Sequence, residues 1–432
     1  MIDYLDVSNE KNKKGDYKKT DVLSVSGEVG IVNQIEFQGR SFAGVSVENY
    51  GIVNEGDVVY TKSPLKANPY GIIKTNKGKA GIVSTLYAVY KPKENTDSNF
   101  VQIYFELDSR MNSYMHPLVN KGAKNDMKVS DENALKGNVT FPKINEQKAI
   151  SNFITELDNL ITLHQRKCDE TKQLKKFMLQ KMFPKNGEKN PEIRFEGFTD
   201  DWEQRKLGDV LICLQNNTFS RADLSNETGV AKNVHYGDVL VKFGEVLDVS
   251  KEQLPMISDE RVLIKYKASF LQNGDVIVAD TAEDSTVGKC SEIAGLNNEI
   301  VLSGLHTIPY RPKEKFASGY LGYYLNSDSY HNQLIPLMQG IKVTSISKSA
   351  LRNTDIIYPE SKEEQAKIGN YFQSLDNLIT LHQRKCCELK KLKEYMANHM
   401  FVNQSIKCDR NIATNHKKLQ ERTKEMGELE SV

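Results

Sequence analysis

The stretch LDNLITLHQRKC at residues 157–168 returns unchanged at residues 375–386, which is 218 positions later. The similarity extends upstream, where Glu146-Gln147 matches Glu364-Gln365. It also extends downstream through four further pairs: Leu174 with Leu392, Met178 with Met396, Met182 with Met400, and Phe183 with Phe401. A shared string of this length at half the chain length indicates an internal duplication, so the other features are interpreted within a repeat.

Each copy of the string predicts a long helix. The first helix begins at about Asn145, whose side chain suits an N-cap, and no Gly or Pro follows until Pro184. Apolar residues recur along it at spacings of three and four, which forms one stripe that Leu160, Leu163 and Leu174 are expected to widen. The stripe residues that we expect to pair are Leu157, Ile161, His164 and Met178 in the first copy and Leu375, Ile379, His382 and Met396 in the second.

The length of these helices requires a partner. About 38 residues at 1.5 Å each give roughly 57 Å, which is too long for one compact domain to cover. The second copy carries the same stripe, so we predict an antiparallel coiled coil of the two helices. In the alternative arrangement, each helix packs on its own domain. His164 and His382 are equivalent positions, and we expect them to pack or pair at the seam and not to bind a metal.

Strand-like runs precede each helix. Residues 56–63 predict a turn that leads into a strand, and residues 80–94 predict one strand closed by a proline. Residues 41–47 alternate like a strand, whereas residues 100–108 suit either a strand or a helix. The predicted fold class is therefore α+β, with two strand-rich domains separated by two long helices that form an antiparallel coiled coil, in a pseudo-twofold internal repeat.

The domains are weak repeats as well. Gly274-Asp275-Val276 lies 218 positions after Gly56-Asp57-Val58, and residues 310–314 follow the similar residues 90–94 by 220. Different loops on a shared scaffold are what two readers of different targets would have. The predicted segments are a first domain at 1–141, a first helix at 142–183, a linker at 184–200, a second domain at 201–358, a second helix at 359–401 and a polar tail at 402–432.

Composition sets limits on the class of protein. Lys and Arg total 58 and Asp and Glu total 57, so the net charge of +1 argues neither for nor against nucleic-acid binding. The sequence has no apolar run of about 18 residues and no signal peptide, so we expect no membrane association. Six cysteines without a CxxC pair indicate a reduced, cytoplasmic protein.

Catalytic motifs are missing from the sequence. It contains no GxxxxGK[ST] phosphate loop and no Gly-rich cofactor loop after a strand. Asn68-Pro69-Tyr70 is similar to the box with which amino-methyltransferases hold a base, but it lacks the second proline, and we interpret it as a turn. A metal nuclease cluster is the alternative interpretation of a further group, which we interpret as a solvated loop: Asp275, Asp280, Glu283, Asp284 and Lys289.

Polar loop residues are the remaining candidates for function. Side chains of Lys, Asn, Gln, Ser, Thr, Tyr and His suit phosphate contacts and hydrogen bonds to base edges. The DNA-binding candidates are Lys62, Ser63, Asn68, Tyr70, Lys74 and Lys77 in the first domain, and His235, Lys289, His306, Gln339, Lys342, Thr344 and Lys348 in the second. Ordinary surface loops would have the same composition, which is the competing interpretation.

A combination of motifs resembles one known family. Each helix is entered through a proline followed by Glu-Gln, at Pro142 and at Pro359. Residues 193–198 with Trp202 resemble the entry into a target recognition domain, and residues 340–343 resemble a Gly-x-Lys turn late in that domain. Over about residues 20–401, the chain thus resembles the specificity subunit of type I restriction-modification systems.

The resemblance implies a function without chemistry. Two target recognition domains would each read one half of a bipartite site in double-stranded DNA, and the helices would set the gap and dock two methyltransferase subunits. S-adenosylmethionine, ATP and Mg would bind partner subunits, including restriction/translocase subunits, and this chain would bind no cofactor and no metal and have no catalytic residue. The alternative is a coiled-coil scaffold whose two heads bind proteins and not DNA.

One departure concerns the start of the chain. At an offset of 218, Met1 aligns with Phe219, so the first domain is expected to lack counterparts of residues 190–218, including Trp202. Residues 424–429 resemble residues 205–210. We therefore hypothesise that the tail at 402–432 completes the first domain.

Overall fold

A computed structural model describes the chain except residues 63–67, 122–126, 186 and 402–432. The chain divides into two compact units. Unit 1 joins Met1–Thr162 to the segment that begins at Cys386, and unit 2 is Leu163–Lys385. Each unit thus holds one strand-rich head and a part of each long helix. We call residues 1–141 head 1 and residues 201–358 head 2.

The two predicted helices are present as α4 (Ile144–Lys181) and α11 (Lys362–His399), each of 38 residues. Helix α4 begins before Asn145, so the prediction of an N-cap at this residue is wrong. The backbone amides of Glu146 and Gln147 already donate to the carbonyl oxygen of Lys143, which closes the first turn earlier. Within the described residues, no helix combines the length and the apolar character needed to span a membrane.

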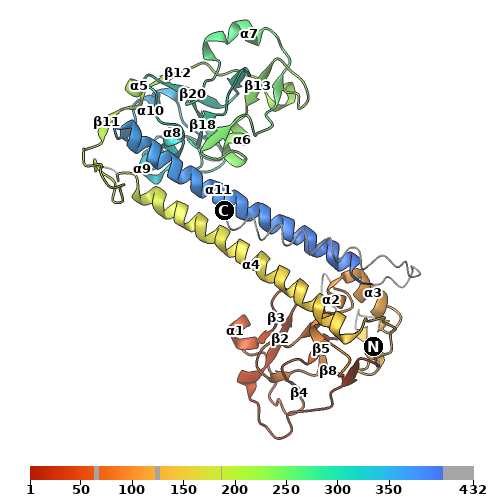
Figure 1. Ribbon diagram of the computed structural model, residues 1–432. Coiled ribbons are helices and arrows are strands. Elements are labelled where there is room, and N and C mark those ends of the chain that lie inside the picture. Colours follow the sequence, from red (N-terminus) through yellow and green to blue (C-terminus); the bar gives the residue numbers. More distant parts are fainter. Residues whose placement is uncertain (63–67, 122–126, 186, 402–432) are drawn as a thin grey trace. The chain divides into compact units, whose positions relative to one another are not determined.

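The helices run antiparallel in unit 2 (Figure 1). The Nδ1 atoms of His164 and His382 lie 3.1 Å apart, and the ammonium of Lys175 lies 2.6 Å from Asp376. Partners on α11 move toward its start as positions on α4 move toward its end, which defines the direction. The predicted pairing of the two histidines is therefore confirmed.

The equivalent contact occurs in unit 1. Lys393 lies 2.7 Å from Asp158, and these residues are the counterparts of Lys175 and Asp376 at the offset of 218. One apolar core contains Ile150, Ile154 and Leu157 from α4 together with Leu389 and Met396 from α11. Each head packs on both helices, so the alternative in which each helix packs only on its own domain is wrong.

Burial follows the predicted stripe with two exceptions. Leu157, Leu375 and Met396 are buried, and Ile161, Met178, Ile379 and His382 are partly buried. Leu160 and Leu174, which were expected to widen the stripe, are 43% and 44% exposed. They lie to the side of the seam, because Leu160 precedes Ile161 and Leu174 precedes Lys175 by one position, and one residue rotates the helix by about 100°.

Head 1 is built on an antiparallel sheet in the order β1-β8-β5-β6. Strand β5 is buried on both faces: Val58 and Tyr60 join the core that contains α2, and Val59 joins a second core with β2, β4 and β7. The elements are β1 (Leu5–Val7), η1 (Lys19–Asp21), β2 (Leu23–Ser26), β3 (Gly30–Asn33), α1 (Gln34–Gln38), β4 (Gly51–Val53), β5 (Val58–Thr61), β6 (Ile73–Thr75), β7 (Gly81–Val83), β8 (Tyr87–Pro92), α2 (Ser98–Glu106), α3 (Asp108–Met115), β9 (Asn120–Lys121), β10 (Met127–Lys128) and η2 (Asn133–Leu135).

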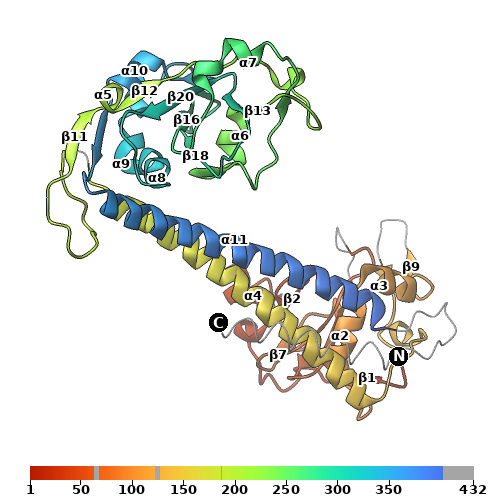
Figure 2. The same cartoon turned by 45° about the horizontal axis from the view of Figure 1, so that its top comes forward.

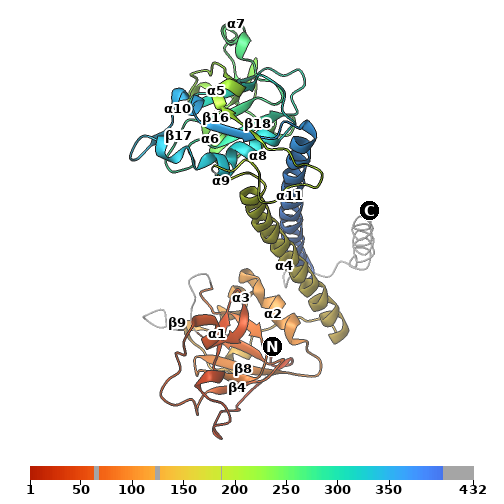
Figure 3. The same ribbon diagram turned by 90° about the vertical axis from the view of Figure 1, so that its left-hand side faces the viewer.

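Three local predictions for head 1 are settled by these elements. Residues 100–108 lie mostly in helix α2, which packs on β6 and shares a core with the long helices; Figure 3 shows α2 beside α4. The single strand expected at 80–94 is two strands, because a turn closed by Tyr87 N–H on the Ser84 carbonyl separates β7 from β8. No strand forms at 41–47, so alternation in that short stretch was misleading.

Head 2 contains a sheet in the order β12-β20-β16-β18-β14 and a smaller sheet β15-β13-β19. Helices α6 and α8 cover opposite faces, since Ile277 packs with α6 and Val276 with α8 (Figure 2). The elements are β11 (Glu203–Lys206), α5 (Leu207–Val210), β12 (Leu211–Cys213), η3 (Arg221–Asp223), β13 (Ala231–Val234), α6 (Tyr236–Val241), β14 (Val246–Asp248), β15 (Met256–Ile257), α7 (Val262–Lys265), η4 (Lys267–Ser269), β16 (Val276–Ala279), β17 (Thr281–Ala282), β18 (Cys290–Ala294), β19 (Val301–Ser303), β20 (Thr307–Pro312), α8 (Tyr320–Asn326), α9 (Asp328–His331), η5 (Ile335–Leu337), β21 (Thr344–Ser345), α10 (Lys348–Arg352) and β22 (Asp355–Tyr358).

The two heads share a strand register that corrects the alignment at the start of the chain. Leu5 of β1 pairs with Pro92, as Leu211 of β12 pairs with Pro312. Residues 5–7 therefore take the place of residues 211–213, and the expectation that head 1 lacks every counterpart up to residue 218 is wrong. A length difference after these strands breaks the constant offset. The hypothesis about the tail at 402–432 lies outside the described residues.

Candidate nucleic-acid interface

A cluster of polar side chains forms in head 2 where β16 ends and β20 begins. The N–H of Asp280 donates to the carbonyl oxygen of His306 at 3.1 Å. The Nδ1 atom of His306 lies 3.4 Å from the Asp280 carboxylate and 3.4 Å from the Thr281 hydroxyl, which itself donates to Asp280 at 2.8 Å. The Nδ1 atom of His306 is thus held by Asp280 and Thr281, the two residues that follow strand β16.

His306 also has an unusual backbone. Its φ of 56° is the one positive value at a non-glycine residue in the described part of the chain. A side chain in this left-handed region is strained, and such residues persist where the surrounding structure holds them. The ring lies edge-on to Tyr236 at 5.3 Å, and 47% of the side chain is exposed. A constrained, half-exposed imidazole is suited to contact a ligand.

His235 lies beside this cluster and has a structural contact. Its Nδ1 accepts a hydrogen bond from the N–H of Gly237 at 3.1 Å and caps α6. Burial, with the nearby Arg221, lowers the pKa of the His235 imidazole, so the ring is neutral at pH 7 and Nδ1 can accept. The ring also lies 4.7 Å from that of Tyr236.

A hairpin continues the cluster. Thr344 and Ser345 of β21 pair with β17, directly after Asp280, and Gln339 exchanges two backbone hydrogen bonds with Ser345. At Gly340, φ is 119° and a Cβ would lie 2.0 Å from the Val343 carbonyl oxygen, so the turn requires glycine. Gln339 and Lys342 are exposed on this hairpin.

Lys348 connects α10 to the same end of the sheet. Its ammonium donates to the Asn216 side chain at 3.2 Å, and Asn216 donates to the carbonyl oxygen of Gly304 at 3.3 Å. The structure therefore brings together a group of sequence-predicted residues that are distant in the chain: His235, His306, Gln339, Thr344 and Lys348, with Lys342 on the same hairpin.

Lys289 does not join them. Its ammonium donates to the carbonyl oxygen of Leu240 at 2.8 Å, and burial lowers the pKa of Lys289. The metal nuclease cluster, which was the alternative interpretation of the acidic residues, does not form among the described residues. Asp275 is buried and paired with Arg311 at 2.7 Å, and no group of three or more metal-ligating side chains occurs in the described part of the chain.

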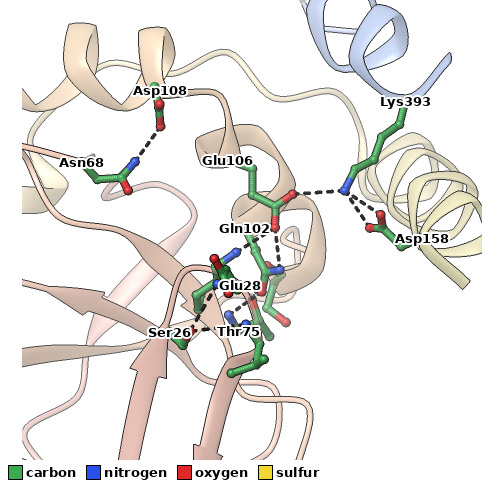
Figure 4. A network of polar contacts seen from close by, with 12 residues as sticks. Ser26, Glu28, Asn68, Thr75, Gln102, Glu106, Asp108, Asp158 and Lys393 are labelled. Atoms are coloured by element: carbon green, nitrogen blue, oxygen red, sulfur yellow. Dashed lines mark hydrogen bonds and ion pairs between the residues drawn. The ribbon is translucent and has the colours of Figure 1, made fainter. Parts of the chain in front are cut away.

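The head 1 candidates are mostly engaged in contacts within the head. Lys62 pairs with Asp131 at 2.9 Å, and Asn68 donates to Asp108 at 2.6 Å (Figure 4). Tyr70 and Lys74 are buried, so the expectation that they line a surface is wrong. Lys77 is exposed, and Ser63 lies outside the described residues.

Lys74 belongs to a network that holds head 1 on the helices. It pairs with Glu106 at 3.0 Å, and Lys393 links Glu106 to Asp158 (Figure 4). Burial would raise the pKa of Glu106, but Lys74, Gln102 and Lys393 together lower it below its usual value. The group is thus a stable carboxylate that joins α2 to the long helices.

Sequence reasoning missed several members of the head 2 cluster. Tyr236 could have been found because it adjoins His235. Thr281 and Asn216 carry no signal of their own in the sequence, because their position depends on β-pairing with residues far along the chain. Asp280 was noticed only as an acidic residue near a turn.

Comparisons with known proteins agree with the repeat. A family model described as type I restriction modification DNA specificity domain matches residues 5–173 and 199–391. The MjaVIII type I restriction enzyme specificity subunit of Methanocaldococcus jannaschii is 24% identical over 354 residues, which cover 80% of this chain and 78% of that protein. The two family matches end 218 residues apart, which is the offset of the repeated helix.

Two solved structures are similar to this chain, and the first of them supports the fold. The S subunit of a type I restriction-modification system from M. genitalium superposes with a TM-score of 0.51 at 11% identity, over 93% of this chain and 95% of that one. The HsdS subunit from Thermoanaerobacter tengcongensis gives a TM-score of 0.45 at 16% identity, over 92% and 93% of the two chains.

Proposed function

Because the chain belongs to the family of type I restriction-modification DNA specificity domains, with one copy in each half, we propose that each head reads one half of a bipartite site in double-stranded DNA. The chain is the sequence-recognition component of such a system and is not an enzyme by itself. The protein-binding scaffold, which was the alternative, is not favoured by this membership.

The observation that carries the proposal is that the two heads share the same strand register but have different loops. Val58 pairs with Tyr90 in head 1 as Val276 pairs with Tyr310 in head 2. The side chains beyond the ends of these strands differ between the heads. Direct readout of bases depends on such side chains, while the scaffold carries no sequence information.

The helices supply a repeated surface for partners. Unit 1 exposes Leu160 on α4 and Tyr395 on α11, and unit 2 exposes their counterparts Leu378 and Phe177. The four side chains are between 43% and 57% exposed. Two equivalent apolar surfaces suit two copies of one partner, which we take to be methyltransferase subunits, with the helices fixing the gap between the half-sites.

The chemistry would belong to other chains. We propose that S-adenosylmethionine, ATP and Mg bind the methyltransferase and restriction/translocase subunits of the complex. Such a complex would act on DNA in the cytoplasm.

The test is to co-express the chain with its methyltransferase subunit and to map methylated adenines in genomic DNA. We expect a bipartite motif with a fixed gap. Exchange of residues 201–358 for those of another specificity subunit should change one half of the motif only. A motif without two parts, or a change in both halves, would contradict the proposal.

The scaffold alternative makes a different prediction for salt. Contacts to phosphates release counterions, so the affinity of the complex for DNA should fall steeply as salt is raised. A protein scaffold would show no specific affinity for DNA at any salt concentration.

A further inference from the structure

The two heads hold the same backbone site at the end of the shared strand pair. In head 1, the N–H of Lys62 donates to the carbonyl oxygen of Leu86 at 3.0 Å. In head 2, the N–H of Asp280 donates to that of His306 at 3.1 Å. Each hydrogen bond directly follows a ladder of the same register, Thr61 with Tyr87 and Ala279 with Thr307. Lys62 is therefore the counterpart of Asp280, and Leu86 is the counterpart of His306.

The side chains at this site are chemically different in the two heads. In head 1, the ammonium of Lys62 is held by Asp131, and Leu86 is 61% exposed. In head 2, Asp280 holds one nitrogen of His306, whose side chain is 47% exposed. The exposed group is thus apolar in head 1 and can form hydrogen bonds in head 2, at one and the same backbone position.

The imidazole of His306 has one nitrogen left for a ligand. Nδ1 lies against Asp280 and Thr281, and Nε2 has no hydrogen-bond partner among the described residues. The left-handed backbone and the ring of Tyr236 fix the direction of the side chain. A ring that is held at one nitrogen presents the other nitrogen to a ligand in a defined direction, which suits recognition.

Cationic and amide side chains surround the histidine in head 2. Lys348 reaches the turn before His306 through Asn216, and Lys342 and Gln339 are exposed on the hairpin that pairs with β17. This arrangement places groups suited to phosphates around one group suited to a base edge. In protein–DNA interfaces, contacts to phosphates usually position the protein, and contacts to base edges recognise the sequence.

We infer that this shared site determines specificity in both heads: His306 reads a base edge of one half-site by a hydrogen bond, and Leu86 makes an apolar contact in the other. The inference rests on the proposed function and adds which residues read. An apolar side chain suits the methyl group of thymine, and an imidazole nitrogen suits the donors and acceptors of the major groove.

Three variants test this inference in the complex with the methyltransferase subunit. His306→Leu introduces the group of head 1, and Leu86→His introduces that of head 2. His306→Gly removes the side chain and suits the left-handed backbone, so it keeps the fold while the contact is lost. Methylated motifs are mapped in genomic DNA, and initial methylation rates are measured on duplexes with each base pair changed in turn.

We expect His306→Leu and His306→Gly to relax the motif at one base pair of a single half-site. Discrimination there should fall about 5- to 150-fold, which is the value of one good base contact. Leu86→His should change one position in the other half-site only. Lys342→Ala is the matched control, since loss of a phosphate contact should weaken binding to all sequences alike and reduce the salt dependence.

An unchanged motif in both His306 variants would overturn the inference while the wild-type bipartite motif still supported the proposed function. A uniform loss of rate on every duplex would also overturn it, because it would assign His306 to the backbone. Failure of the wild-type complex to methylate a bipartite motif would instead contradict the proposed function itself. Thermal melting of each variant checks the fold, and His306→Gly should melt no lower than wild type.

Discussion

The two copies of the Glu-Gln pair at the start of the long helices have identical sequences, but only their glutamines have the same role. Gln147 and Gln365 do the same thing: each is fully buried, donates to the preceding proline carbonyl, and accepts a backbone N–H from the head. Glu146 is exposed, whereas Glu364 is buried, 1% exposed at its side chain.

The two glutamates differ because donor side chains of residues 194 and 202 contact Glu364. Arg194 donates to both oxygens of Glu364, at 2.6 and 2.9 Å, and Trp202 donates at 3.3 Å. Trp202 is the single tryptophan of the chain, so head 1 has no counterpart of it. The glutamine contacts to backbone groups are thus present in both copies of the motif. The contacts of the glutamate depend on Arg194 and Trp202 and are present only in the second copy.

Removing the glutamate in each copy should give the largest contrast. Glu364→Ala leaves Arg194 and the indole N–H buried without their acceptor, and we expect a loss of about 3–5 kcal/mol in the stability of unit 2. Glu146→Ala should cost less than about 0.5 kcal/mol, as for other exposed positions. Urea unfolding followed by the fluorescence of Trp202 measures the first, and hydrogen exchange in head 1 measures the second. Equal losses would show that the two glutamates are equivalent.

A second contrast concerns pH. Strand β18 places Glu292 opposite Val276, where β6 of head 1 places Thr75 opposite Val58. Burial raises the pKa of Glu292 to about 7, although the N–H groups of Gly319 and Gly322 favour its ionised form.

The folded-state pKa of Glu292 is therefore above its usual value of 4.5. Its contribution to stability is fully present below pH 4.5 and is lost as pH rises toward 7, because the unfolded chain ionises more readily. At about 1.4 kcal/mol per pH unit the loss reaches about 3 kcal/mol. We expect Glu292→Gln to abolish this slope in Trp202-monitored unfolding, and a variant with the wild-type slope would contradict the assignment.

The two glutamines should behave alike. Gln147→Ala leaves the buried N–H of Asp97 without an acceptor, and Gln365→Ala does the same to Ala317. We expect each to cost about 1–3 kcal/mol in its own unit. Hydrogen exchange at peptides of each unit measures both, with the exposed Lys148→Ala as a control near zero. A large effect in one unit and none in the other would break the equivalence.

Much of the architecture could be predicted because its signals are local or repeated. The three-four spacing of Leu157 and its neighbours predicts the helix, and the repeat supplies the partner, so the antiparallel pair of helices is confirmed. The separate strands at 80–94 were missed because a turn without Gly or Pro separates them.

Burial of charged and aromatic candidates could not be predicted. Lys74 and Tyr70 lie in a polar stretch that suits a surface loop, yet both are buried: Tyr70 packs its ring near that of His116, and helix α2 brings Glu106 to Lys74. The cluster around His306 could be named in part, since His and Lys are visible in the sequence, but its members meet only through strand pairing. Contact of this cluster with DNA stays a prediction.

The smallest contrast is between the two copies of the ion pair across the helices. Lys175 lies within 2.8 Å of both Glu245 and Asp376 and is 13% exposed, whereas Lys393 is 28% exposed and has Asp158 at 2.7 Å and Glu106 at 3.8 Å. A pair that is more exposed gains less, since water and salt screen it. Double-mutant cycles to alanine should give a coupling energy of about 1 kcal/mol for Lys175–Asp376 and about 0.5 kcal/mol for Lys393–Asp158.

The salt dependence of these couplings provides the check. The coupling of Lys393–Asp158 should decline more steeply between low salt and 1 M salt, where the screening length is about 3 Å. An equal or larger coupling for Lys393, unaffected by salt, would mean that the surrounding head and not exposure sets the strength of the pair. Both pairs join the same two helices. That result would therefore mean that contacts with the heads, and not the helices themselves, cause the difference in coupling energy between the two units.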